Sequence, residues 1–119
     1  MASPSFGTWP APAAAGSGGL TPIGVVRLRL GAGTEAIDGQ IGDVVTSINV
    51  NGTGDYELVM NADAGDVNDL FWTIGAGDFA DRIVVLFPTL PTMALNVYDA
   101  AGAHAAIGRV CITFWKPAT

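Results

Sequence analysis

The stretch DVVTSINVNGTGDYELVMN, residues 43–61, is the part of the sequence that decides the fold. Residues 43–50 are rich in β-branched side chains, which favour an extended strand whose alternate residues point to one face. That face would carry Val44, Thr46, Ile48 and Val50. Residues 55–61 alternate too, with Tyr56, Leu58 and Met60 opposite Glu57 and Val59. Between the two runs, NGTG at 51–54 suits a tight turn because glycine accepts positive φ. The stretch therefore predicts a β-hairpin.

Five further runs read as strands, at residues 24–30, 70–74, 82–87, 93–99 and 107–115. In the first of them, Val26, Leu28 and Leu30 alternate with Val25, Arg27 and Arg29. No window has sustained helical periodicity, and residues 33–41 are expected to hold one short turn at most. Short strands with Gly, Pro and Asp turns predict an all-β protein, an antiparallel β-sandwich or jelly roll of about seven to eight strands.

The composition changes sharply near Leu20. Residues 1–19 contain no charged side chain and consist mostly of Ala, Pro, Gly and Ser. Such a composition predicts an extended arm with a glycine-rich joint rather than a folded unit. We therefore divide the chain into an N-terminal anchoring arm at 1–20 and a head domain at 21–119.

The arm has few groups with which to hold a surface. Ordering each backbone residue costs roughly 1–2 kcal/mol, and the large anchors are Phe6 and Trp9, with Pro10 and Pro12 favouring an extended course. Burying two aromatic side chains contributes roughly 10 kcal/mol, which does not offset ordering the whole arm. We expect these residues to lie along another protein or a neighbouring copy. The alternative is an arm that folds back on its own domain.

The composition excludes several classes of partner. The chain has 119 residues, half of them hydrophobic and only 13% charged, and its net charge is −6. So few charges favour a subunit that hides part of its surface against a partner. Nucleic-acid and anionic-membrane binders need clustered cations, and only Arg27 and Arg29 lie together in the sequence. We expect neither partner.

The remaining sequence signals point to the cytosol. Cys111 is the only cysteine, which excludes an intrachain disulfide and a thiolate metal cluster, and its apolar neighbours VCITF predict a buried, inert thiol. No segment is long and apolar enough for a membrane span. The N-terminus lacks the basic start and continuous apolar stretch of a signal peptide. We expect the chain to be made in the cytoplasm.

Two motifs imitate ligand sites. GAGTEA at 31–36 and GAGDFA at 75–80 resemble a dinucleotide fingerprint, but that motif needs a following helix, and strands are expected here, so turns are favoured. The loop at 61–69 gathers Asp63, Asp66 and Asp69 without the spacing of a calcium loop. A solvated acidic loop is the favoured interpretation, and a weak cation site that makes assembly cation-dependent is the alternative.

Catalytic chemistry is hard to build from these residues. His104 is the single histidine, and a general base needs a nucleophile or an orienting carboxylate beside it, such as Asp99. A surface or interface histidine is favoured. We expect no enzyme, no metal and no cofactor.

Adjacent aromatic residues in two strands mark a candidate interface. Phe71 and Trp72 must point to opposite faces of their strand, as must Phe114 and Trp115. One of each pair fills the core, and the other faces solvent or another subunit. The candidate interface residues are Trp72, Tyr98 and Trp115.

Three segments carry a family resemblance: GTGDYEL at 52–58, NVYDAAG at 96–102 and VCITFW at 110–115. Together they resemble the jelly-roll head domains of tailed-bacteriophage fibres and capsid spikes, which are similar in architecture to C1q and tumour necrosis factor. The resemblance covers roughly residues 43–115 and implies a homotrimer in a virion. After Gly102 the chain departs from that pattern, with Ala103-His104-Ala105-Ala106.

These observations lead to two functional expectations. The first is a structural virion protein, a capsid decoration (cement) protein whose head forms a homotrimer on the capsid surface and whose arm binds the major capsid protein. The alternative is the receptor-binding tip of a tail or head fibre. Fibre tips usually end a much longer chain, whereas this sequence starts at Met1 and has no shaft repeat before the head. The first reading is therefore preferred.

Overall fold

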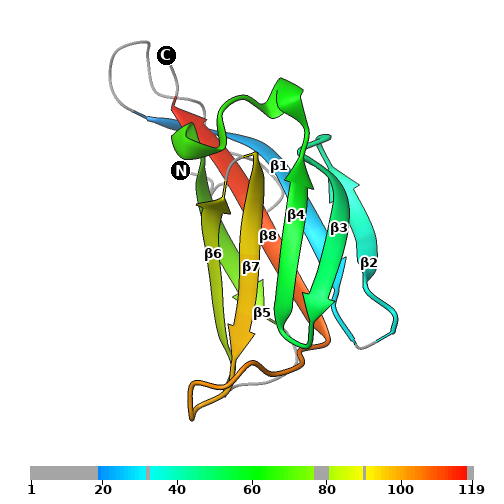
Figure 1. The fold of residues 1–119 in the computed structure, drawn as a ribbon. Helices are drawn as coiled ribbons and strands as arrows, with labels where there is room; N and C mark the ends of the chain where they lie inside the picture. The colour runs from blue at the N-terminus through cyan, green and yellow to red at the C-terminus, as the bar shows by residue number, and fades with distance from the viewer. Residues whose placement is uncertain (1–18, 32, 77–80, 90, 118–119) are drawn as a thin grey trace, which may run out of the picture.

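The chain is represented by a computed structural model that describes residues 19–31, 33–76, 81–89 and 91–117. Within these ranges it forms eight strands and two single-turn 3-10 helices (Figure 1). The strands are β1 Leu20–Arg29, β2 Ala36–Ile41, β3 Val45–Gly52, β4 Asp55–Met60, β5 Phe71–Ala76, β6 Ile83–Thr89, β7 Thr92–Tyr98 and β8 Arg109–Pro117. The helices are η1 Ala62–Ala64 and η2 Val67–Asp69.

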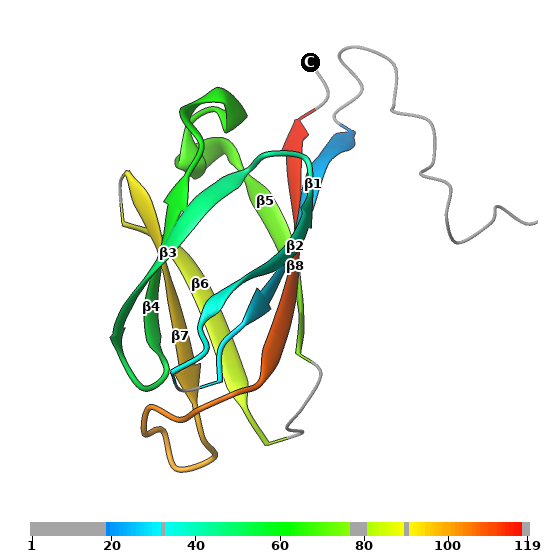
Figure 2. The same cartoon turned by 90° about the vertical axis from the view of Figure 1, so that its right-hand side faces the viewer.

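The strands form two antiparallel four-stranded sheets, with the order β2-β1-β8-β5 in the first sheet and β3-β4-β7-β6 in the second. Figure 1 shows the second sheet in front of the first, and Figure 2 shows the two layers from the side on which β2 and β3 lie. Hairpins β1–β2, β3–β4 and β6–β7 each stay within one sheet. The predicted antiparallel β-sandwich is confirmed.

The core lies between the two sheets and follows the alternation seen in the sequence. Val26, Leu28 and Leu30 are fully buried, as predicted for residues 24–30. The largest buried side chains come from both layers: Tyr56, Phe114, Leu28, Leu30, Leu58, Met93, Leu95, Ile107 and Ile112. Burying one such side chain contributes roughly 1.5–3 kcal/mol. This interior holds the two sheets together.

The hairpin predicted at 43–61 is confirmed. Strands β3 and β4 pair around a turn in which Gly54 has φ +70°, a conformation that favours glycine. Tyr56 and Leu58 are buried and Met60 is partly buried, as the alternation predicts. The prediction of which β3 residues face inward is wrong at the start of the strand, because the pairing with β4 shifts between Val45 and Ser47. Val45 is consequently buried beside Val44, whereas Thr46 is exposed and donates to the Val59 carbonyl at 3.0 Å.

The expectation for residues 33–41 is also wrong, because Ala36–Ile41 forms strand β2. Its alternation is hidden by a shift in the pairing with β1 between Arg27 and Leu28. In addition, the inward position that pairs with Val26 holds a polar residue, Gln40. The Gln40 carboxamide accepts a hydrogen bond from the Val45 N–H at 2.8 Å and donates one to the Val45 carbonyl at 2.9 Å. Gln40 thus satisfies backbone groups where the chain crosses from one sheet to the other.

The first glycine motif belongs to a turn, as predicted. Of this motif, Gly31 and residues 33–35 lie between β1 and β2, with Gly33 at φ +78°, and Ala36 begins a strand rather than a helix. In the second motif, Gly75 and Ala76 end β5, and residues 77–80 lie outside the described residues.

Candidate functional site

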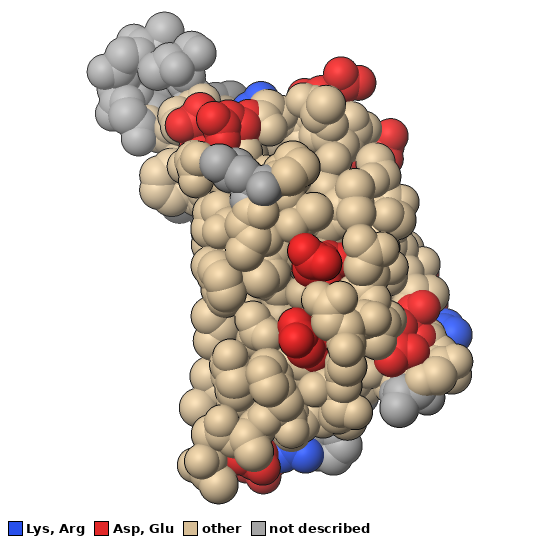
Figure 3. All heavy atoms as spheres, in the orientation of Figure 1, with Lys and Arg blue, Asp and Glu red and all other residues tan. Residues whose placement is uncertain are grey.

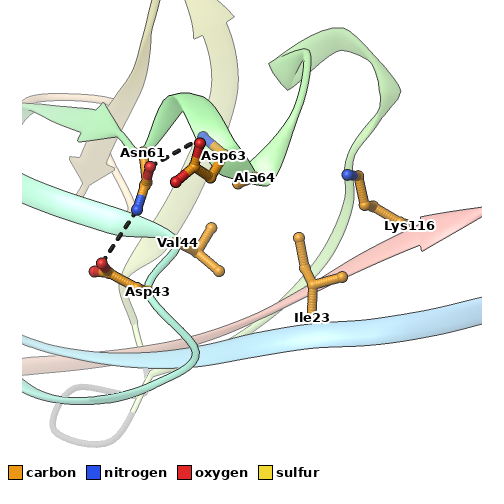
Figure 4. Close-up of a pocket in the computed structure, with 7 residues that line it drawn as sticks. All are labelled: Ile23, Asp43, Val44, Asn61, Asp63, Ala64 and Lys116. Carbon is orange, nitrogen blue, oxygen red and sulfur yellow. Dashed lines mark hydrogen bonds between the residues drawn. The ribbon is translucent and has the colours of Figure 1, made fainter.

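A polar pocket of about 300 Å³ lies at the end of the sandwich where β1 begins and β8 ends (Figure 4). Its lining residues are Ile23, Asp43, Val44, Asn61, Asp63, Ala64 and Lys116. Figure 4 shows Asp43, Asn61 and Asp63 together on one side of the pocket, with Lys116 on the other side, beyond Ile23. The pocket therefore separates acidic groups from a single ammonium group.

The Asn61 carboxamide organises the acidic side of this pocket. Its Nδ2 donates to Asp43 Oδ2 at 3.1 Å, and its Oδ1 accepts from the Asp63 N–H at 2.9 Å. The Asn61 backbone N–H donates to the Val44 carbonyl at 2.7 Å. These bonds attach η1 to the connection between β2 and β3. The residues lining the pocket include no Ser, Thr, Cys or His side chain.

In the acidic loop that follows, Asp63, Asp66 and Asp69 are exposed, as the favoured interpretation predicted, whereas Ala64 and Val67 are buried. Asn61 caps η1, and Asp66 caps η2 by accepting from the Asn68 N–H at 2.9 Å. Such local bonds are the ordinary use of Asn and Asp at the start of a helical turn. Within the described part of the chain, no three or more His, Cys, Asp and Glu side chains group as metal ligands would.

His104 and Asp99 are held in separate structural contacts. His104 Nδ1 lies 3.0 Å from the Gly54 carbonyl oxygen, and its ring lies 4.8 Å from that of Tyr98, centroid to centroid. Asp99 Oδ1 accepts from the N–H groups of Ala101 and Ala103 at 2.9 and 3.0 Å. The histidine thus fastens the β7–β8 loop to the β3–β4 turn, and the carboxylate shapes its own loop.

The adjacent aromatics point to opposite faces, as predicted. Trp72 pairs with Phe114 on the inner face, where Phe114 is fully buried and Trp72 packs against the core. Phe71 pairs with Trp115 on the outer face of the first sheet. Tyr98 pairs with Ile83 at the end of β7. No partner chain is present, so an interface role for Trp72, Tyr98 and Trp115 stays a prediction.

The most unusual surface lies along β5 and β6, the edge strands of the two sheets. Strands β2 and β3 approach each other and close the opposite side of the sandwich, whereas β5 and β6 do not come as close together. Trp72, Ile74 and Val84 are consequently only partly buried at the flank of the core. Four further apolar side chains are exposed: Phe71 by 52%, Ile83 by 55%, Val85 by 38% and Phe87 by 42%. We call the surface formed by these seven residues the open side.

The open side is also free of charge. No Asp, Glu, Lys or Arg occurs in residues 70–77 or 83–98, which include all of β5, β6 and β7. Figure 3 shows the outer face of the second sheet with few charged side chains. Exposed apolar side chains without charged neighbours in sequence are typical of interaction sites in soluble proteins. The sequence signal for this surface is the absence of charged residues over 83–98. The interface prediction did not use this signal, because it rested on individual aromatic residues.

Two further sequence predictions concern Cys111 and the N-terminal arm. The prediction of a buried Cys111 is wrong, because its thiol is exposed on the outer face of the first sheet, opposite Arg27 in the strand pairing. The proposed arm contacts Phe6, Trp9, Pro10 and Pro12 lie outside the described residues. In the described part of the chain, no helix has the length and hydropathy to cross a bilayer.

In comparisons with known proteins, no family model, no curated protein and no solved structure matches this chain.

Proposed function

We propose that this chain is a non-catalytic structural subunit that associates with copies of itself through the open side. The observation that carries this proposal is the uncharged, apolar edge formed by β5 and β6. Elsewhere the chain carries a net charge of −6, so two copies repel each other over most of their surface. At the open side they can meet without that repulsion.

A comparison of three of the four edge strands, β2, β3 and β6, supports this choice. Strand β2 has an irregular register and carries Asp38, and β3 has two register shifts. Such bulges and charges protect an edge from pairing with another chain. Strand β6 pairs regularly with β7 over its whole length and presents Ile83, Val85 and Phe87 outward. Its proline, Pro88, lies near the end of the strand, so the backbone of residues 83–87 can pair with a strand of another chain.

The free energy of apolar burial at the open side is comparable with the cost of association. Covering the exposed parts of Phe71, Ile83, Val85 and Phe87 would remove roughly 300 Å² of apolar surface on each chain, which for two chains contributes about 15 kcal/mol at about 25 cal/mol per Å². Association costs roughly 4–15 kcal/mol in lost translation and rotation. Apolar burial alone is therefore close to break-even, and backbone pairing along β6 supplies further stabilisation.

A Val85→Lys substitution tests the open side. Val85 points outward, so a lysine there is tolerated by the fold but places a charge in each copy at the contact. In sedimentation-equilibrium measurements we expect the wild type to be an oligomer, a trimer in the preferred form, and the variant to be a monomer. Ser47→Lys is the matched control, since Ser47 is exposed on the other edge strand of the same sheet. An unchanged mass for Val85→Lys would contradict the proposal.

The specific form we propose is a capsid decoration protein, whose sandwich forms the head and whose residues 1–19 attach it to a shell protein. The charge-free composition of those residues supports an anchoring role. Purified virus particles should contain the chain in hundreds of copies, counted by quantitative mass spectrometry. A handful of copies per particle would instead favour a fibre tip, and none would remove both viral functions.

Deleting residues 1–19 should leave a folded oligomer that no longer binds the particle.

A further inference from the structure

Three of the five cationic side chains gather on the outer face of the first sheet around one carboxylate. Asp38 Oδ1 lies 2.8 Å from an Arg29 terminal nitrogen, Asp38 Oδ2 lies 3.3 Å from Arg27 Nε, and Arg109 lies at 4.0 Å. Only Arg27 and Arg29 are close in sequence, and the pairing of β1 with β8 brings Arg109 directly opposite Arg29. We call these four residues the arginine cluster.

The arginine cluster is short of negative charge. Two like charges directly opposite each other destabilise a sheet, and Arg29 faces Arg109 in this way. Asp38 supplies one negative charge against three positive ones, which leaves an excess of two in a chain whose net charge is −6. About half of each arginine side chain is exposed, so guanidinium N–H groups remain accessible from solvent. Two added carboxylates would balance the charge.

An apolar groove of about 270 Å³ continues from this cluster along β1 and β2. It is lined by Val25, Arg27, Gly39, Gln40, Ile41 and Cys111. Ile41 is 76% exposed, the largest exposure among the large hydrophobic residues of the described chain. Arg27 belongs both to the groove and to the cluster. The surface therefore offers positive charge at one end and an apolar patch at the other.

We propose that this surface binds an extended acidic polypeptide segment of a partner, with two carboxylates on the arginine cluster and an apolar side chain in the groove. Arg29, Arg27 and Val25 are spaced two residues apart along β1, spanning roughly 13 Å. An extended peptide repeats its side chains at the same interval, so the pattern Glu-x-Glu-x-Leu matches the surface. Guanidinium groups bind carboxylates through paired hydrogen bonds, and the groove gives the leucine an apolar contact.

The groove distinguishes a peptide from a simple anion. A phosphate or sulfate ion would use the arginines but would leave Val25 and Ile41 uncovered. The proposal is independent of the open side, because the surface is formed by β1, β2 and β8 and includes no residue of β5 or β6. In the assembly proposed above, the segment would belong to the protein to which the subunit attaches.

The test uses the full chain and a fluorescent peptide, Glu-Ser-Glu-Ser-Leu, in anisotropy titrations at low salt. Arg109→Gln should weaken binding roughly tenfold, the effect of losing one charge-assisted pair. Lys116→Gln removes the same charge from the other end of β8 and should bind as the wild type does. Ile41→Ser should weaken binding of this peptide but not of Glu-Ser-Glu-Ser-Ser. Because Ile41 is exposed, that variant keeps the fold and tests the groove independently of the arginines.

Three results would overturn the proposal. The first is equal affinity for the wild type and Arg109→Gln. The second is displacement of the peptide by inorganic phosphate together with equal affinity for the peptides ending in leucine and in serine, which would make the cluster a simple anion site. The third is salt-sensitive self-association that Arg109→Gln abolishes while the peptide does not bind, which would assign the cluster to the acidic loop of a second copy.

Discussion

The Tyr56 hydroxyl donates a 3.1 Å hydrogen bond to the Leu30 carbonyl and joins the two sheets through the interior. Tyr56 lies in β4 of the second sheet, and Leu30 directly follows β1 of the first. Both side chains are buried, so neither the hydroxyl nor the carbonyl has easy access to replacement water.

Removing this hydroxyl should destabilise the protein. Tyr56→Phe keeps the ring but leaves the Leu30 carbonyl without this donor, which should lower the free energy of unfolding by about 1–2 kcal/mol. Urea denaturation followed by fluorescence would measure the change. Tyr98→Phe is the control, since Tyr98 is only partly buried. Equal stability of the wild type and Tyr56→Phe would show that the bond contributes nothing.

The same residue predicts a loss of stability in alkali. Burial of the hydroxyl is the largest effect and raises the pKa of Tyr56 above its usual 10.0. A hydrogen bond with the Gly54 backbone opposes this rise, and the negative charge of Glu35 adds a smaller contribution to it. The folded protein therefore holds the phenolic proton more tightly than the unfolded chain does. The stability gained is complete below about pH 10 and falls as the pH rises through the pKa of the folded state. Urea midpoints measured across this range should fall less steeply for Tyr56→Phe than for the wild type.

Gly54 should resist substitution, unlike its neighbour in the same hairpin. Its φ is +70°, and an added Cβ would lie 2.6 Å from the Ala105 carbonyl oxygen and 2.7 Å from that of Val97. Gly54→Ala should therefore cost at least about 2 kcal/mol, from backbone strain and displaced backbone neighbours. Gly52→Ala is the matched control, because nothing lies within 4 Å of its added Cβ. Thermal melts of similar midpoint for both variants would contradict the turn geometry.

Truncating a side chain should destabilise the protein in the core but not at the exposed end of β2. Leu28 is fully buried between the sheets, so Leu28→Ala should lower the free energy of unfolding by about 2–5 kcal/mol through lost burial and a residual cavity. Ile41→Ala should change it by no more than about 0.5 kcal/mol, since Ile41 is largely exposed. Chemical denaturation measures both, and a large effect at Ile41 would mean that the fold itself covers this residue.

Asp38 should be more important for stability than its surface position suggests. Asp38→Asn removes the one carboxylate among Arg27, Arg29 and Arg109 and leaves their mutual repulsion. We expect a loss of about 1–2 kcal/mol, limited because the arginines are half exposed and screened by solvent. Added salt should reduce the loss. Asp69→Asn is the control, because Asp69 is exposed and forms no ion pair among the described residues. An effect of equal size there would contradict the role of the cluster.

Sequence alternation predicted most of the sandwich because hairpin strands bury alternate side chains. The run at 55–61 shows this directly, with Tyr56 and Leu58 buried as expected. Strand β2 was missed for an identifiable reason: its inward Gln40 is polar and its register shifts beside Asp38. Cys111 was misplaced because apolar neighbours in sequence alternate between the two faces of a strand, and this residue faces outward beside Arg27.

By itself, the sequence determined the all-β class, the hairpin at 43–61 and a charge-free region at 83–98, since each depends on residues that are near neighbours in the chain. Only the tertiary structure decided which surfaces these residues form. It placed Phe71 and Phe87 on the adjoining edges of two sheets, and it brought Arg109 opposite Arg29. The physical reason is that strand order is set by packing between distant segments, and local periodicity says which face a residue occupies but not which strand will lie beside it.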